Sequence, residues 1–449
     1  MAVHRLRLAC SLVLLALLLV GSSRSVVGAE PADGELRAAV DVQNATRARL
    51  RVLGDAFTCP EARFVSYRRS DAEPELADQW YVASQLWADA ALYGVLNSSP
   101  PPDGLDWDSG DARCHLAKGV VFLDRLWDYT SGGYFARSNP VGTQVDRGAR
   151  FGDDNTLAGL AFLAMSRLVD DVQQQQYLHA ARREADFLLG SGLWDGTFGG
   201  GFWWNTNKGD TPEGKPAQTN ALAALFFGRL YEATGEGAYR EAALRSLLWL
   251  DTILYDPARQ AYRWSVAYQD PTHRAGAPVV SNRLFNYDQS LAIEAEVLAA
   301  RLDGDPNRLT RARAIGQALP SLFSSQDGHG YNLEAGIEQV YTSYAAWSSL
   351  GHLALYDLDQ DPQWLELVQA NVAALDSALR EADAGYAYRV YRCVDRIARG
   401  CESGQARFVV DHTRDTTAQA WPQQLRASLA ARLQPATPPP AEPEDGAAG

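Results

Sequence analysis

The fold is predicted most directly by residues 219–250, TNALAALFFGRLYEATGEGAYREAALRSLLWL. Apolar residues recur here at three and four positions, on both sides of the joint at 234–237, and this period is typical of amphipathic helices. Glycine in the joint can end the first helix, and the polar residues that follow can begin the next. The segment is therefore predicted to be a long helical hairpin with a tight turn.

The same pattern continues through most of the chain, with similar tight joints at 303–306 and 359–362. Four helices, starting near 153, 217, 286 and 338, recur at spacings of about 50 to 70 residues, which indicates a repeated hairpin. Six hairpins can close a ring, so we predict an all-α, six-hairpin (α/α) toroidal barrel. The expected helices span about 31–53, 75–97, 111–129, 153–170, 174–190, 217–234, 237–255, 286–303, 305–325, 338–357, 361–380 and 414–432.

Long links precede several of these helices and are rich in glycine, tryptophan, asparagine and aspartate. They span 130–152, 191–216, 256–285 and 326–337. Binding and catalytic residues tend to lie on loops that a rigid scaffold positions. We therefore expect the functional site on the face of the barrel that carries the long links.

Composition and the chain ends limit the class of protein. With 46% hydrophobic and 21% charged residues the chain is typical of a globular protein, and a net charge of −14 makes nucleic acid an improbable partner. Arg5 and Arg7, an apolar stretch at 8–20 and the small residues ending at Ala29 predict a signal peptide over residues 1–29. An uncleaved anchor is the alternative.

No other stretch reaches the ~20 apolar residues that a membrane span requires. We expect one catalytic domain over 30–434, a disordered Pro-rich acidic tail over 435–449, and a secreted, periplasmic or cell-surface location without a membrane span after signal cleavage.

Four cysteines remain after signal cleavage, and an even number in an exported chain favours disulfides. The short spacing of Cys393 and Cys401 favours that pair, which leaves Cys59 with Cys114. A zinc site is the weaker alternative because the chain has no CxxC sequence. We therefore predict no metal site.

Two adjacent carboxylates, Asp153 and Asp154, open a strongly apolar helix that begins FGDDN. Carboxylates at a helix start can be simple caps, because free amides and the helix dipole favour them there. Alternatively, one attacks a sugar carbon while its neighbour, kept protonated by the first charge, donates a proton to the leaving oxygen.

Polar and aromatic residues in the links form a second candidate set. The loop 195–207, DGTFGGGFWWNTN, has three consecutive glycines that let the backbone approach a ligand, with aromatic rings for stacking and amides for hydrogen bonds. The alternative is that the two tryptophans plug the barrel rim. Two other helix starts would add polar groups to the same end of the barrel. The predicted substrate-binding residues are Asn155, Trp203, Trp204, Asn205, Asn207, Thr219, Asn220, Tyr287, Asp288 and Gln289.

The segments FGDDNTLAGLAFLA, GGFWWN, TNALAALFFGRLYEATGEGAYREAA and NYDQSLAIEA, in this order, resemble glycoside hydrolase family 76, the endo-α-1,6-mannanases with six-hairpin (α/α) barrels. The likeness covers roughly residues 75–380. It implies a retaining mechanism with Asp153 as nucleophile and Asp154 as acid/base. The chain differs from the usual family pattern at Thr156 and Leu157, where an aromatic residue is common, and at Asp288, where asparagine is common.

We therefore expect an exported, monomeric, retaining glycoside hydrolase that cleaves α-1,6-mannosidic linkages in an α-mannan-type polysaccharide or oligosaccharide, without a cofactor. Two alternatives are a non-catalytic glycan-binding protein and a sugar epimerase of the N-acylglucosamine 2-epimerase type. The epimerase would use a histidine pair, His329 and His412, for proton transfer. Asp411, His412 and Asp415 could also form an acid–base cluster, although a helix cap explains them more simply.

Overall fold

The computed structural model describes residues 29–73, 75–98, 100–139, 142, 144–208, 214–393 and 408–434. Residues 1–28 of the predicted signal peptide, the predicted tail at 435–449 and Cys401 lie outside the described residues. Within the described ranges, none of the helices combines the length and the apolar character needed to cross a membrane.

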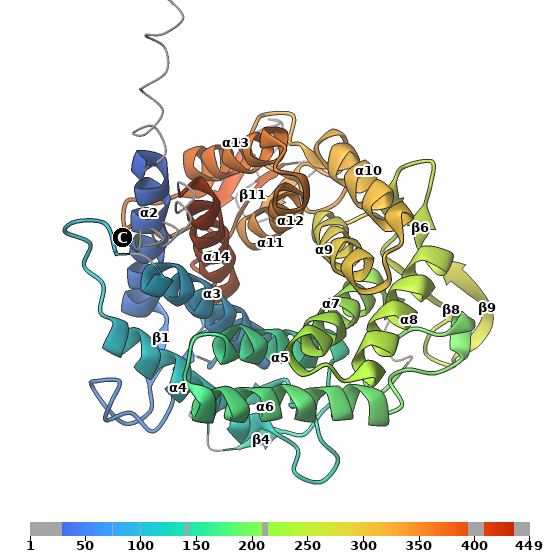
Figure 1. Cartoon of the computed structure of the whole chain (residues 1–449), viewed down its shortest axis with the longest axis horizontal. Coiled ribbons are helices and arrows are strands. Elements are labelled where there is room, and N and C mark those ends of the chain that lie inside the picture. The colour runs from blue at the N-terminus through green and yellow to red at the C-terminus, as the bar shows by residue number, and fades with distance from the viewer. Residues whose placement is uncertain are drawn as a thin grey trace, which may run out of the picture.

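The helices form two concentric rings (Figure 1). The inner ring contains α3 (Gln79–Ser98), α5 (Gly152–Ser166), α7 (Ala217–Thr234), α9 (Asn286–Asp303), α11 (Thr342–Ser348) with α12 (Leu350–Asp359), and α14 (Thr416–Leu433). The outer ring contains α2 (Ala29–Arg49), α4 (Ser109–Leu126), α6 (Asp171–Gly190), α8 (Gly237–Ile253), α10 (Pro306–Phe323) and α13 (Pro362–Leu379).

Neighbouring inner helices contact each other all the way round, and α14 closes the ring by packing against α3. Five hairpins pair an inner helix with the outer helix that follows it in sequence. The sixth pairs α14 with α2, so the two ends of the described chain complete the barrel. The predicted (α/α) toroidal barrel is confirmed.

Small residues allow the inner helices to approach closely. A side chain at Gly159 of α5 would place its Cβ 2.4 Å from the ring of Phe226 on α7, and one at Gly228 of α7 would place it 2.6 Å from Leu298 on α9. Because the inner helices touch neighbours on several sides, nearly every residue of α5 and α9 is buried. This explains why α5 is apolar almost all round. The helix α9 differs, because it also buries the polar side chains of Asn286, Asp288, Gln289, Ser290, Glu294 and Glu296.

Most outer helices begin with a capping aspartate, whereas most inner helices do not; among the helix starts that the structure describes, the exceptions are the outer helix α8 and the inner helix α14. Four outer helices start with an aspartate whose side chain accepts hydrogen bonds from the first-turn amides: Asp108, Asp170, Asp305 and Asp361. By contrast, α5, α7, α9 and α11 start after residues whose side chains make no capping bond, namely Phe151, Pro216, Phe285 and Tyr341. The polar side chains in the first turns of these inner helices are therefore not used to cap the helices and can make other contacts.

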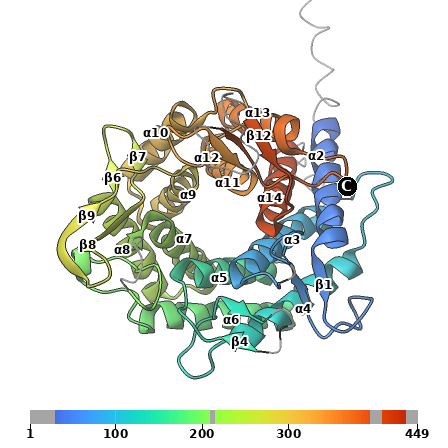
Figure 2. The ribbon, with the colours of Figure 1, turned by 180° about the vertical axis from the view of Figure 1, so that it is seen from behind.

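The long links contain short strands, which the sequence did not predict, and Figure 2 shows them from the other side of the ring. In the described residues they form small antiparallel sheets of two or three strands. The strands are β1 (Arg51–Leu53), β2 (Val65–Tyr67), β3 (Arg137–Ser138), β4 (Val145–Asp146), β5 (Lys215–Pro216), β6 (Tyr255–Asp256), β7 (Ala261–Tyr262), β8 (Ser265–Asp270), β9 (Ala275–Val280), β10 (Gln339–Tyr341), β11 (Arg389–Arg392) and β12 (Phe408–Asp411).

One predicted disulfide is present: Cys59 is bonded to Cys114 and joins the first link to α4. This excludes the zinc alternative for these two residues. Cys393 is also disulfide-bonded, and its predicted partner, Cys401, lies outside the described residues.

Candidate active site

A cleft of about 390 Å³ lies beside the start of α5 and contains Asp154. We call it the α5 cleft. Its wall comes from the start of α3, the hairpin of β3 and β4, and the glycine-rich link before α7. The lining residues are Asp78, Trp80, Tyr81, Ala136, Arg137, Asp146, Gly148, Ala149, Phe151, Asp154 and Trp204.

Asp153 is 5% exposed and is fixed by two hydrogen bonds. Its Oδ2 accepts from the indole Nε1 of Trp204 at 2.9 Å, and its Oδ1 accepts from the backbone amide of Asp154 at 3.1 Å. Both bonds favour the ionised carboxylate. Asp153 is not itself among the lining residues, but these bonds hold it in one orientation against Trp204 and Asp154, which both line the α5 cleft.

Asp154 is in the opposite electrostatic situation. Burial, followed by the negative charges of Asp153 and Asp78, raises the pKa of Asp154 well above its ordinary value, and Arg137 only partly opposes the shift. Asp154 therefore retains its proton at a pH at which an ordinary carboxyl group has lost it. A fixed carboxylate beside a protonated carboxyl group is the pairing that glycoside hydrolysis requires.

The glycine-rich loop positions Trp204. Its backbone accepts from the amide of Gly152 at 2.7 Å and donates to Gly214 at 2.9 Å, and its ring packs against Phe151 with centroids 4.9 Å apart. These contacts tie the loop to the first turn of α5. Because these contacts fix both the backbone and the ring of Trp204 against the start of α5, its indole N–H points at Asp153.

A buried ammonium group holds the inside of this loop. Lys215 is completely buried, and its Nζ donates to Oδ1 of Asp195 at 2.8 Å and to the carbonyls of Thr197 and Gly200 at 2.7 and 2.6 Å. Burial lowers the pKa of Lys215 to about 8, although Asp195 opposes the shift. Lys215 thus holds together a loop whose own regular structure is limited to a 3₁₀ turn at Thr197–Gly199.

Two expectations about this loop are not supported by its geometry. Trp203 is 2% exposed and donates its indole N–H to Asp195 at 2.8 Å, so it lies inside the loop instead of beside a sugar. The plug alternative describes this residue. The glycines do not approach a ligand either: a Cβ at Gly200 or Gly201 would lie within 3 Å of the rings of Trp194 or Trp249, respectively.

Three predicted sugar-binding amides have structural roles instead. In four hairpins a buried carboxamide near the start of an inner helix bonds both the N–H and the C=O of an aromatic residue in the preceding link. Because both ends of the carboxamide are occupied, these side chains anchor the links, and none of them is among the residues that line the α5 cleft. The pairs are Asn155 with Tyr134, Asn220 with Phe202, Gln289 with Tyr262, and Gln419 with Tyr386.

Asn205, Asn207 and Thr219 are likewise away from the lining of the α5 cleft. Asn205 is buried, and its Oδ1 accepts from the amide of Asn207 in a local turn at 2.9 Å. Asn207 is exposed and accepts from Arg274 through its carbonyl. Thr219 is buried, with its methyl group against Gly152, where it spaces α7 from α5.

Tyr287 and Asp288 lie at the start of α9. Tyr287 packs against Tyr344 with ring centroids 4.7 Å apart, and burial, then Asp288, raises its pKa. Asp288 is completely buried, which raises its pKa well above the ordinary value. A protonated carboxyl group offers one donor and one acceptor, as a carboxamide does. Asp288 can therefore replace the asparagine that is common at this position in the family it resembles.

The sequence analysis missed the part of the cleft that comes from α3 and the β3–β4 hairpin. Asp78 pairs with Arg137 at 3.2 Å, and both line the cleft with Trp80 and Tyr81. Burial raises the pKa of Asp78 too. The sequence did carry a signal, because Asp78 to Tyr81 open an inner helix with the same mixture of acidic and aromatic residues as FGDDN.

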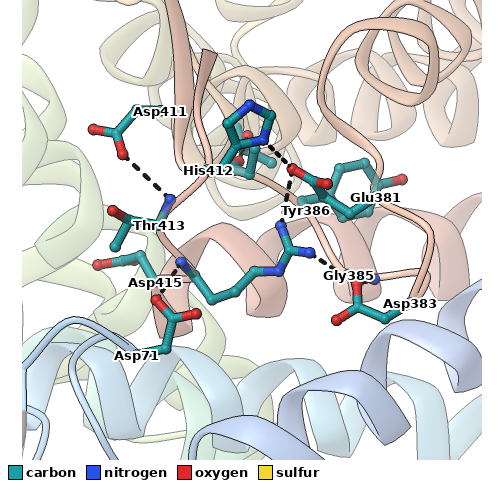
Figure 3. Close-up of polar contacts among 12 residues, drawn as sticks. Asp71, Glu381, Asp383, Gly385, Tyr386, Asp411, His412, Thr413 and Asp415 are labelled. Atoms are coloured by element: carbon teal, nitrogen blue, oxygen red, sulfur yellow. Dashed lines mark hydrogen bonds and ion pairs between the residues drawn. The ribbon is translucent and has the colours of Figure 1, made fainter. Parts of the chain in front are cut away.

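The cluster at 411–415 is structural (Figure 3). Asp415 caps α14 by accepting from the amides of Thr417 and Ala418, so the cap interpretation is confirmed. Arg414 pairs with Glu381 at 3.2 Å and Asp383 at 2.9 Å, and its amide donates to Asp71. These contacts join the last link of the barrel to the first.

The histidines of the epimerase alternative have separate partners. His412 is exposed and contacts Glu381 at 2.6 Å, whereas the ring of His329 packs edge-on against Phe408. Neither lines the α5 cleft. The structure thus gives no support to a pair of histidines acting on one substrate at this site.

Comparison with known proteins finds one family model that is similar to the central part of the chain. The model of glycosyl hydrolase family 76 matches residues 143–349, the part of the chain that holds the Asp153–Asp154 pair and the glycine-rich loop. The chain is a glycoside hydrolase that is similar to family 76 over this segment. No curated protein matches its sequence.

Solved structures share the fold of this chain. A family 76 glycoside hydrolase from a bovine Bacteroides thetaiotaomicron strain has a TM-score of 0.68 at 19% identity, covering 88% of this chain and 77% of that one. An inactive variant of the α-1,6-mannanase of Salegentibacter sp. HEL1_6, with two consecutive aspartates replaced by asparagine and α-1,6-mannotriose bound, has a TM-score of 0.62 at 17% identity, covering 89% and 100%.

A sugar epimerase from a ruminal bacterium also has this fold, with a TM-score of 0.63 at 14% identity, covering 89% of this chain and 98% of that one. The barrel alone therefore does not distinguish hydrolase from epimerase, and the distinction rests on the family match and on the site.

Proposed function

We propose that this protein is an exported, monomeric, retaining hydrolase of family 76 that cleaves α-1,6-mannosidic linkages in an α-mannan-type polysaccharide. The observation that carries the proposal is the contrast between Asp153, held by Trp204, and Asp154, whose pKa is raised at the wall of the cleft. The Salegentibacter mannanase supports the choice of substrate, because its inactive variant lacks two consecutive aspartates and binds α-1,6-mannotriose.

In the first step, the carboxylate of Asp153 attacks C1 of the sugar and the glycosidic C–O bond breaks. Asp154 donates its proton to the leaving oxygen, so the leaving sugar departs as a neutral alcohol. In the second step Asp154, now ionised, takes a proton from water, and the resulting oxygen attacks C1 and releases Asp153. Two displacements at one carbon retain the α configuration.

Export is supported by the Cys59–Cys114 disulfide, because disulfides persist in oxidising compartments. The signal peptide over 1–29, the domain over 30–434, and secretion or a periplasmic or cell-surface location belong to the same proposal. Mass analysis of protein recovered outside the cytoplasm tests it, since the mature chain should begin at Glu30.

Incubation with α-1,6-mannan, followed by measurement of new reducing ends, tests the activity. The parent should release reducing ends, while Asp153→Asn and Asp154→Asn should each lose most of the rate. With an activated aryl mannoside, Asp154→Asn should still form the glycosyl intermediate and added azide should restore turnover, whereas Asp153→Asn should form none. Immediate β-anomeric product would exclude double displacement.

A non-catalytic glycan-binding protein predicts a different result from the same assay. The parent would bind mannan without releasing reducing ends, and both asparagine variants would bind as the parent does. That outcome would refute the enzyme assignment and leave the Asp pair as a helix-start feature.

A further inference from the structure

A second cavity, of about 270 Å³, lies inside the helical ring beyond the α5 cleft. We call it the far cavity. Its wall consists of residues from the later turns of five inner-ring helices: Trp87, Ala91, Leu225, Arg229, Glu294, Val297, Leu298, Arg301, Leu350, Leu353, Ala354, Asp357, Gln424, Ser428 and Arg432. Trp80 of the α5 cleft and Trp87 of the far cavity are seven residues apart on α3, about 10 Å along the helix.

A column of four tryptophans separates the two cavities. Trp80 contacts Trp347 with ring centroids 5.6 Å apart, Trp347 stacks on Trp421 at 4.1 Å, and Trp421 contacts Trp87 at 5.7 Å. The two central rings, Trp347 and Trp421, are at most 1% exposed. The far cavity is therefore a distinct space, not an extension of the hydrolytic cleft.

Two buried acceptors in the wall of the far cavity lack a donor among the described residues. They are Oε1 of Glu294 and Oε1 of Gln424, on side chains that are 8% and 5% exposed. The other oxygen of Glu294 accepts from Arg229 at 3.2 Å. Leaving a buried acceptor without a donor costs about 1–3 kcal/mol, so a molecule in this cavity gains by supplying hydrogen-bond donors.

The charges around the cavity are matched within the protein. Arg229 pairs with Glu294, Arg432 with Asp357 at 2.5 Å, and Arg301 with Glu232 at 3.0 Å. A guanidinium group has five N–H donors, so each can also donate to a ligand. A neutral ligand whose groups both donate and accept suits this lining better than an ion, and hydroxyl groups do both.

We propose that the far cavity binds a single neutral sugar unit at a site separate from the hydrolytic cleft. Its volume is about nine times the ~30 Å³ of a water molecule in the liquid, which is room for a hexose ring. Trp87, Leu225 and Leu350 supply apolar wall opposite the polar groups. The choice of mannose as the probe rests on the proposed function. The inference that the far cavity binds a neutral sugar rests only on the volume and the lining of that cavity.

Rim residues leave an entry path. The side chains of Arg301 and Asp357 are 57% and 51% exposed, whereas Glu294 and Gln424 deeper in the cavity are buried. A sugar can therefore enter from solvent at this end of the ring without displacing the tryptophan column.

To test this, the parent and the variants Gln424→Met, Ala354→Phe and Gln175→Met are titrated with D-mannose, and binding is measured by tryptophan fluorescence. Gln424→Met removes one acceptor, Ala354→Phe fills the cavity, and Gln175, exposed on α6, is the matched control. We expect saturable binding to the parent and the control, at least tenfold weaker binding to the other two, and sugar density touching Glu294 and Gln424 in mannose-soaked crystals of the parent.

Equal affinity in all four proteins would overturn the proposal. Loss of the signal when mannotetraose occupies the α5 cleft of the non-hydrolysing Asp153→Asn variant would also overturn it, because the mannose would then be in that cleft. If circular dichroism shows that Gln424→Met does not fold, the affinity of Ala354→Phe for mannose and the sugar density in the soaked parent crystal test the proposal instead. Release of reducing ends from mannan is measured separately, so failure of the far site and failure of the proposed function give different results.

Discussion

Replacing Lys215 with methionine is expected to destabilise the protein and to slow hydrolysis, because Lys215 holds the loop that carries Trp204. The substitution keeps an unbranched chain of similar length but removes the ammonium group. The carbonyls of Thr197 and Gly200 lose a donor at 2.7 and 2.6 Å, and Asp195 loses one of its cationic partners.

The magnitude follows from these contacts. Breaking a buried ion pair costs about 3–5 kcal/mol, and the relief of no longer burying the ammonium group offsets part of this. Asp195 is 30% exposed and keeps Trp203 and Lys208 as donors, which places the expected loss at the lower end, about 3 kcal/mol.

Lys208 provides a matched control. It pairs with the same carboxylate at 3.0 Å, but its side chain is 25% exposed, so Lys208→Met should cost about 0–1 kcal/mol. Urea unfolding at pH 7, followed by circular dichroism, measures both losses, and kcat on mannan should fall for Lys215→Met only. Equal losses for the two variants, or a loss below about 1 kcal/mol for Lys215→Met, would refute the argument.

Three further outcomes are expected. Because the folded-state pKa of Asp154 lies above the ordinary value of 3.8, its ionisation opposes folding, and the stability of the parent falls as pH rises from that value through the folded-state pKa. The thermal midpoint of Asp154→Asn minus that of the parent should therefore grow from pH 4 to pH 7. A constant difference would contradict the raised pKa. Trp204→Phe keeps an aromatic ring against Phe151 but removes the hydrogen-bond donor to Asp153, so kcat should fall about tenfold or more with little change in KM. Trp203→Phe changes a residue inside the loop and should mainly lower the thermal midpoint. Identical effects of the two variants would contradict the placement of the two tryptophans. The double variant Cys59→Ser/Cys114→Ser should unfold with a free energy lower by about 4 kcal/mol, because the bridge closes a loop with a sequence separation of 55, and unchanged urea unfolding would contradict this.

The helical period and the tight joints of the sequence were sufficient to predict the barrel. The hairpin at 219–250 is observed as α7 and α8, joined by the turn at Gly235, whose φ of 73° is left-handed. Apolar period and turn residues are local properties, so they can be recognised without knowing which segments meet. The Asp153–Asp154 pair could be singled out for the same reason, since two adjacent carboxylates at the start of an apolar helix can be recognised from the five residues 151–155 alone.

Only the tertiary structure decided which of the other polar residues face the cleft. Trp203 and Trp204 are neighbours in the sequence, yet one is enclosed with Lys215 and Asp195 while the other contacts Asp153. Asn155 follows the Asp153–Asp154 pair directly, but its carboxamide is occupied by the backbone of Tyr134, 21 residues earlier. Such assignments depend on contacts between distant segments, and residue type does not reveal them.

The same reason explains what was missed. Asp78 and Arg137 reach the cleft from two links, and their pairing at 3.2 Å exists only because the barrel brings the start of α3 beside α5. The far cavity is likewise made by side chains of five inner-ring helices that no local pattern connects. Local sequence thus determined the elements and the catalytic candidates, whereas ring closure determined which side chains share a cavity, because a cavity is defined by contacts between residues far apart in the chain.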